Sequence, residues 1–95
     1  DAKLESQIVT ARIPEIDIRL RQQLVHFVQA LRDLDLKKIP SISETLDWAR
    51  ALIILHAEEL NAEVVRKTLN LLLKYEDDIA GTLPQVNEMV RRAIR

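Results

Sequence analysis

Apolar side chains recur at steps of three and four residues in the first third of the chain, the spacing that places them on one side of a helix. This side would consist of Ile16, Leu20, Leu24, Phe27, Leu31 and Leu34. A start near Pro14 to Asp17 is favoured, because proline fits a first turn and an acid there faces the positive end of the helix dipole. Before this helix, a weaker stripe of Leu4, Ile8 and Ala11 predicts a short N-terminal helix or turn.

A second long helix is expected after a connector that ends at Pro40, because Ile39 precedes a proline and is pushed away from helical dihedral angles. Ser41 and Glu44 have the spacing of a capping box, in which the hydroxyl and the carboxylate each satisfy a free backbone N–H. The helix would bury Ile42, Leu46, Trp48, Ala49, Leu52, Ile53 and Leu55, and would expose Asp47, Arg50 and Ile54. So wide an apolar arc predicts a central helix with neighbours on two sides.

Two further helices are predicted in the C-terminal third of the chain. Asn61 is a suitable N-cap for the first of them, which carries two apolar rows. The rows are Val65, Leu69 and Leu72, and Val64, Leu71 and Tyr75. Gly81 would end a following helical turn in a left-handed conformation, and the last helix would begin near Thr82 and Pro84. Its buried stripe would be Leu83, Val86, Met89, Val90, Ala93 and Ile94.

These patterns predict an all-α fold, a small helical bundle of four main helices plus a short N-terminal helix. We expect a single domain over residues 1–95, since 47% apolar residues and a net charge of -1 fit a folded chain. The balanced charge disfavours nucleic-acid binding driven by bulk charge. The longest apolar run, Ala51–Leu55, is far shorter than the roughly 20 residues that cross a bilayer. Because the chain begins at Asp1 without a methionine, we expect a fragment or a processed product.

Few residues suggest chemistry, and each has a plainer structural interpretation. His26 lies on the polar side of its helix and should be solvated, whereas His56 should cap or edge the helix before it. The acid pairs at 58–59 and 77–78 are expected at exposed helix ends. Trp48 should anchor the core or a domain interface, with its N–H bonded to an acceptor. With no cysteine and one glycine, the chain lacks thiol chemistry and a phosphate-binding loop, so we predict no catalytic and no metal-binding residues.

Three segments carry specific sequence motifs: ETLDWARAL at Glu44–Leu52, TLNLLLKYEDDI at Thr68–Ile79, and an LR..DL connector at Leu31–Leu36. The run from Leu31 to Ile79 that contains them resembles the C-terminal helical lid of MoxR-type AAA+ ATPases. Within that family it resembles the subgroup that includes the CoxD-like accessory ATPases of aerobic carbon monoxide dehydrogenase maturation. The resemblance implies a lid-type bundle, preceded in the parent protein by an α/β nucleotide-binding domain that holds ATP and Mg²⁺. The lid itself would have no cofactor and no activity alone.

The resemblance also implies where nucleotide phosphates would be sensed. In many lids of this family a Ser-Pro-Arg sequence opens the second long helix, and its Arg reaches the phosphates. The matching positions here are Ser41, Ile42 and Ser43, so the Arg is missing. Glu44 adds negative charge at the same place, and a capping box would occupy the amides that an anion needs. The candidates that remain on this lid face are Ser43, Glu44 and Arg50, and Arg50 is expected to pair with an acid three residues earlier.

We therefore expect the lid subdomain of a cytoplasmic MoxR-type AAA+ ATPase with a chaperone-like role in metalloenzyme maturation or complex assembly. Its partners would be its own ATPase core, neighbouring subunits of a ring oligomer and an unidentified client protein, with no nucleic acid and no membrane. One alternative is a free-standing helical adaptor that presents an apolar groove, or a dimerisation module. The exposed Ile54 would mark a contact with another domain. A second alternative is a small all-helical enzyme of the chorismate mutase type, in which Arg with Glu or Gln would clamp a dianion.

Overall fold

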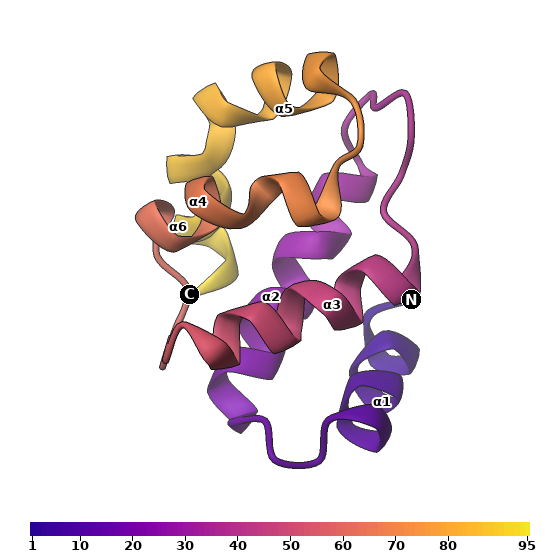
Figure 1. Cartoon of the computed structure of the whole chain (residues 1–95), viewed down its shortest axis with the longest axis vertical. Coiled ribbons are helices and arrows are strands. Elements are labelled where there is room, and N and C mark those ends of the chain that lie inside the picture. The colour runs from indigo at the N-terminus through magenta and orange to yellow at the C-terminus, as the bar shows by residue number, and fades with distance from the viewer.

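The protein is a helical bundle with no strand, as seen in a computed structural model that describes residues 1–95 (Figure 1). Its elements are α1 (Ala2–Arg12), α2 (Ile18–Arg32), α3 (Ile42–Ile54), α4 (Ala62–Leu72), α5 (Glu76–Thr82), the 3-10 turn η1 (Leu83–Gln85) and α6 (Val86–Ala93). The radius of gyration is 12.0 Å. The predicted all-α fold and the N-terminal helix are confirmed, although α1 is as long as α4, and α5 is a helix where the sequence predicted only a helical turn that ends at Gly81.

Helix α2 runs through the middle of the bundle and contacts most of the other helices. It packs against α1, α3 and α6, while α4 packs against α3 and α6 (Figure 1). Figure 1 shows α3 and α4 crossing the front of α2 side by side, with α5 above them. The prediction that the helix starting at Ile42 has more than one neighbour is confirmed, and α4 also packs against two helices.

Side-chain caps fix the starts of the four longer helices. The first-turn amides of Leu4, Leu20, Glu44 and Val64 donate to Asp1, Asp17, Ser41 and Asn61 respectively, at 2.8–3.2 Å. Such a bond satisfies a backbone N–H that has no partner within the helix. Ser41 and Asn61 act as predicted, whereas the start of α2 is set by Asp17 as N-cap, and Pro14 lies outside the helix.

The core is centred on two aromatic residues from α2 and α3. The rings of Phe27 and Trp48 lie 5.5 Å apart between centroids, and both side chains are fully buried. The indole N–H of Trp48 donates to Thr68 Oγ1 on α4 at 2.7 Å, so the polar edge of this ring is satisfied inside the core. The predicted role of Trp48 as a core anchor with a bonded N–H is confirmed. The predicted apolar side of α2 is buried too, with Leu34 at its edge.

The predicted apolar stripe of α1 is wrong. Leu4 is 55% exposed, whereas Glu5 is only 5% exposed and Val9 is fully buried. The helix has turned a carboxylate toward the bundle because Arg32 on α2 binds it there. A charge can be buried in this way only when a partner compensates for the loss of solvation.

The C-terminal third also differs in detail from the predicted pattern. Gly81 lies inside α5 and has no left-handed backbone, because α5 continues directly into η1. The turn at η1 changes the helical phase before α6, which leaves Leu83 outside the stripe that α6 buries. Five residues expected on apolar faces are exposed: Leu55, Leu71, Tyr75, Leu83 and Ile94. Leu55 and Ile94 follow the last residue of their helices, where the helical period no longer sets direction.

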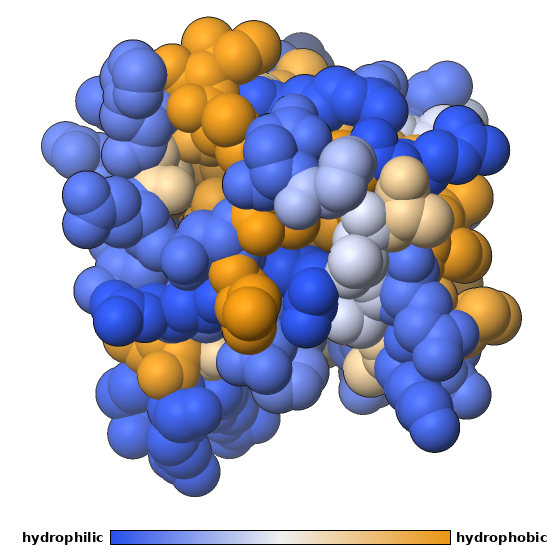
Figure 2. All heavy atoms as spheres, turned by 90° about the horizontal axis from the view of Figure 1, so that it is seen from below, coloured by the Kyte–Doolittle hydropathy of each residue, from blue (hydrophilic) through white to orange (hydrophobic).

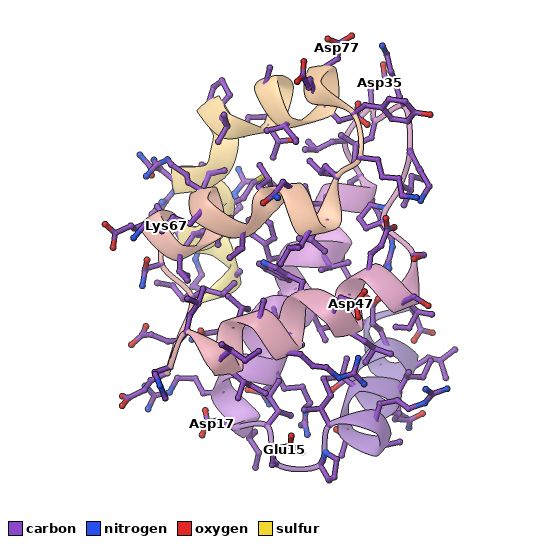
Figure 3. All side chains as sticks on the ribbon, in the orientation of Figure 1. Glu15, Asp17, Asp35, Asp47, Lys67 and Asp77 are labelled. Carbon is purple, nitrogen blue, oxygen red and sulfur yellow. The ribbon has the colours of Figure 1, made fainter.

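Helix α5 holds the connector between α2 and α3 in place. The buried carboxylate of Asp78 accepts the backbone N–H groups of Lys37 at 2.9 Å and Lys38 at 3.2 Å. The neighbouring Asp77 is exposed and pairs with the Lys37 ammonium at 2.7 Å, at the end of the molecule where Figure 3 also places Asp35. The expectation of an exposed acid pair is therefore right for Asp77 and wrong for Asp78, whose position depends on the backbone of a segment about 40 residues away.

Candidate functional site

The first candidate region is the N-terminal end of α3, where the family resemblance would place phosphate sensing. The N–H of Ser41 donates to Glu44 Oε1 at 2.8 Å, and the N–H of Glu44 donates to Ser41 Oγ at 3.2 Å. Lys38 Nζ lies 3.2 Å from the same carboxylate. Burial would raise the pKa of Glu44, but the hydrogen bonds from Ser41 and Lys38 outweigh it and lower the pKa below 4.5. The predicted capping box is confirmed, and it occupies amides that an anion would need.

The other residues of the lid-face set lie on the outside of α3. Ser43 is exposed in the first turn, and Arg50 lies about two turns further along. Arg50 Nη1 is 3.6 Å from Asp47 Oδ1, which confirms the predicted pair on the helix surface. Ser43, Glu44 and Arg50 line none of the clefts of the molecule, so the structure does not bring them together around a common space.

A second polar cluster, which the sequence patterns missed, joins α1, α2 and α3. Arg32 donates to both carboxylate oxygens of Glu5 at 2.7 Å, and it also donates to the carbonyl of Pro40. Gln29 and Thr45 each donate to one of the same carboxylate oxygens, at 2.8 and 3.4 Å. Burial opposes ionisation of Glu5, but these hydrogen bonds and the charge of Arg32 lower its pKa below 4.5. Every partner is internal, so the cluster fastens three segments together and leaves no free oxygen for chemistry.

The third region is the junction of α3 and α4, which we call the α3–α4 corner. Two adjoining open clefts, of about 410 and 420 Å³, meet there and share His56, Ala57 and Glu58. The first is also lined by Glu15, Ile16, Asp17, Arg19, Leu20 and Ile53. The second is also lined by Leu55, Glu59, Asn61, Glu63, Val64 and Lys67. In Figure 3 the loop between α3 and α4 runs along the left edge, with Asp17 below it and Lys67 above it.

The backbone at the corner is defined by the end of α3. The N–H of His56 donates to the carbonyl of Ile53 at 2.9 Å, and the N–H of Ala57 donates to that of Leu52 at 3.0 Å. This pair of bonds is a Schellman motif, and it holds His56 at a φ of 60°. His56 is the only residue other than glycine with a positive φ, a conformation that usually favours glycine at this position. The prediction that His56 caps its helix is confirmed.

Apolar and acidic side chains are mixed on the surface of the corner. Ile54 is 74% exposed, more than any other large apolar residue of the chain, and the adjacent Leu55 is 52% exposed. The ion pair between Arg19 and Glu59 is long, at 3.8 Å, and exposed on both sides. Figure 2, which views the molecule from the end that carries the α1–α2 loop, shows apolar atoms in separate patches among hydrophilic ones. The expected outward position of Ile54 is confirmed.

The remaining polar groups do not form a further cluster of ligands. No group of three or more His, Cys, Asp or Glu side chains lies close enough to hold a metal ion. Thr82 Oγ1 is buried without a hydrogen-bond partner beside a smaller cleft of about 230 Å³, but Asp77 and Asp78 in that cleft are already bonded to Lys37 and its neighbour. His26 is exposed, as expected. None of the helices combines the length and the apolar character needed to cross a bilayer.

Comparisons with protein-family models, with curated proteins and with solved structures found no match for this chain.

Proposed function

We propose that this chain is the helical lid subdomain of a MoxR-type AAA+ ATPase of the CoxD-like kind. The support comes from the motifs between Leu31 and Ile79 and from what their residues do in the bundle. ATP and Mg²⁺ would be bound by a nucleotide-binding domain that precedes Asp1 in the parent chain. The lid would act in the cytoplasm as part of a ring whose ATP hydrolysis drives the maturation of a metalloenzyme or the assembly of a complex.

The observation that carries the proposal is that the resembling segments bond to one another. Trp48 of the ETLDWARAL segment donates to Thr68 of the TLNLLLKYEDDI segment. Asp78 of the latter accepts the amides of Lys37 and Lys38, directly after the LR..DL connector. Arg32 of the connector binds the carbonyl of Pro40 just before α3. Each of the three resembling segments thus contributes a residue that bonds to another part of the same helical bundle. A structural lid requires such contacts.

A lid of this kind would work mechanically. It would pack against the nucleotide-binding core of its own subunit or of a neighbour, so that the nucleotide state sets the angle between two rigid bodies. The capping box at the start of α3 and the absence of an arginine at Ser43 disfavour a phosphate contact from this end of the lid. In this proposal the phosphates are held by the core domain, and the lid responds to its movement.

The coding sequence upstream of Asp1 provides the first test. A GxxxxGKS/T motif within the length of one α/β domain is expected there, and a stop codon next to the codon for Asp1 would contradict the proposal. The parent chain should then hydrolyse ATP. Calorimetry of the 95-residue chain with ATP and Mg²⁺ should show no binding, and micromolar affinity would contradict the absence of a phosphate site.

A matched pair of arginine variants in the parent chain separates a phosphate-sensing lid from a mechanical one. Arg50 and Arg19 are both exposed and each pairs loosely with one carboxylate, so Arg50→Ala and Arg19→Ala remove the same groups. Both variants should keep kcat and KM for ATP within about twofold, since neither residue would touch the nucleotide. A loss of more than about tenfold in kcat for Arg50→Ala alone would show that Arg50 senses phosphate after all.

The second candidate function is a free-standing helical adaptor. The α3–α4 corner favours it, because Ile54 and Leu55 expose apolar surface next to two open clefts. The same upstream coding sequence separates the two candidates, since an adaptor requires no nucleotide-binding domain.

A further inference from the structure

We propose that the α3–α4 corner binds a segment of a partner protein that presents Lys or Arg side chains beside apolar ones. This inference does not depend on the lid proposal, because it rests only on the shape, charge and apolar content of the corner. It assigns an interaction surface to residues between positions 15 and 20 and between 53 and 67, which the lid-face resemblance does not include.

The shape of the corner suits an extended contact rather than a small ligand. The two clefts are open and adjoin at His56, Ala57 and Glu58, so together they form one shallow depression from the start of α2 to the first turns of α4. Enclosed pockets bury most of a small molecule, whereas open depressions of this kind take side chains that project from another protein surface. The Schellman motif fixes the backbone between the clefts, so the depression does not require ordering on binding.

The charge of the corner selects a basic partner. Five carboxylate side chains line the clefts, against two basic ones, although the chain as a whole is nearly neutral. The carboxylates are Glu15, Asp17, Glu58, Glu59 and Glu63, and the basic residues are Arg19 and Lys67. Complementary charge of this sort speeds association and rejects acidic partners.

Apolar surface at the same place requires that the partner be more than a polycation. Leu55 is half exposed in the second cleft, Val64 lies beside it, and Ile53 lines the first cleft. Ile54, which lies between these two residues in the sequence and lines neither cleft, is the most exposed large apolar side chain of the chain. Covering these groups would remove apolar area from water, which is the main source of binding free energy. The acidic residues around them repel anionic lipid and nucleic acid, so a protein segment is the occupant that fits both properties.

The test uses a defined probe, a fluorescein-labelled 14-residue amphipathic helix made of Leu and Lys. A matched peptide has Glu in place of every Lys. Fluorescence anisotropy should show binding of the Leu/Lys peptide that weakens as salt is raised, and no binding of the Leu/Glu peptide. In two-dimensional NMR spectra of the chain, the Leu/Lys peptide should shift the amide resonances of residues 15–20 and 53–67. Shifts spread evenly over all acidic residues, or located elsewhere, would overturn the proposal.

A pair of charge-reversal variants locates the effect. Glu58→Lys with Glu59→Lys places two cations on the corner and should weaken binding of the Leu/Lys peptide about tenfold or more. Asp33→Lys with Asp35→Lys makes the same change in net charge outside the corner, near the upper end of the molecule where Figure 3 places Asp35, and should leave affinity within about twofold. Equal losses in both variants would mean that only net charge matters, and the proposal would fail.

A third measurement distinguishes a partner segment from a second copy of the chain. Analytical ultracentrifugation of the chain alone should show a monomer over the concentrations used for NMR. A dimer whose formation shifts the same corner resonances would assign the surface to self-association and overturn the proposal.

Discussion

The two ends of α3 are built in opposite ways. At its N-terminal end the side chains of Ser41 and Glu44 each accept the backbone N–H of the other residue, and Lys38 donates to Glu44. The nearby Glu5 and Arg32 are paired inside the bundle. At its C-terminal end only backbone hydrogen bonds close the helix, while apolar and acidic side chains around it remain exposed. The same helix therefore has one end whose polar groups are used internally and another whose groups are available to a partner. In α3, stability and the proposed recognition are therefore placed at opposite ends of one helix.

Replacing Arg32 should have the largest effect on stability, because Arg32 binds Glu5 near the N-terminal end of α3, where polar groups bond to one another inside the bundle. Arg32→Ala leaves the buried carboxylate of Glu5 without its cation and frees the carbonyl of Pro40. The free energy of unfolding should fall by roughly 3 kcal/mol, as expected when one partner of a buried ion pair is removed. Urea denaturation followed by circular dichroism measures this change. The control Arg50→Ala removes an exposed pair and should change stability by less than about 1 kcal/mol.

Acid should weaken the polar contacts near the N-terminal end of α3 in particular. Because the pKa of Glu5 is lower in the folded protein than its ordinary value of 4.5, the folded state binds fewer protons there than the unfolded chain. Its contribution to stability is complete above pH 4.5 and is lost as the pH falls through the folded pKa. Glu44 adds a loss of the same sign.

Thermal unfolding between pH 3 and 7 tests this assignment to Glu5. The Glu5→Gln variant should be less stable than the natural chain at pH 7, but should lose less stability on acidification. Parallel stability curves for the two proteins would contradict the role given to Glu5.

The capping box should contribute less than the buried pair. Ser41→Ala removes the acceptor of the Glu44 amide and should cost about 1 kcal/mol in the free energy of unfolding. Ser43 lies in the same turn, is exposed and caps nothing, so Ser43→Ala is the matched control and should change stability by less than about 0.5 kcal/mol. Chemical denaturation of both variants provides the comparison, and equal losses would exclude a specific effect of the cap.

The smallest change in stability is expected at the C-terminal end of α3, where a substitution should stabilise the protein rather than destabilise it. His56→Gly relieves a positive φ that glycine adopts without steric cost, so it should stabilise the protein by about 0.5 kcal/mol after the added flexibility of the unfolded chain is subtracted. His26→Gly is the control, because His26 is exposed in the interior of α2, and there glycine should cost about 1 kcal/mol. A loss of stability in both variants would show that His56 contributes contacts beyond its cap.

Much of the fold can be predicted from the sequence where one local rule decides. The steps of three and four in α2 and the capping residues Ser41 and Asn61 act within a single helix, and the structure confirms each of them. The stripe of α1 was predicted wrongly because its direction depends on Arg32, a residue 27 positions from Glu5. The position of Asp78 depends in the same way on the backbone of Lys37.

The candidate sites also divide into features that depend on one helix and features that depend on distant segments. The pairing of Arg50 with Asp47 lies three residues apart on one helix and is predicted correctly. The α3–α4 corner brings Glu15 and Asp17, from the loop before α2, next to Glu58 beyond α3, and no local pattern connects positions so far apart. The sequence indicated this surface only through the exposed Ile54 and the exposed acid pair at 58–59.

An all-helical chain, the starts of α3 and α4 and the apolar face of α2 could be predicted from the sequence alone, because hydrogen bonds and side-chain periodicity within a helix depend on near neighbours. Which carboxylates are buried and which surround an open surface depends on the packing of the whole bundle. A buried charge needs a partner, and whether that partner is present depends on how distant segments pack.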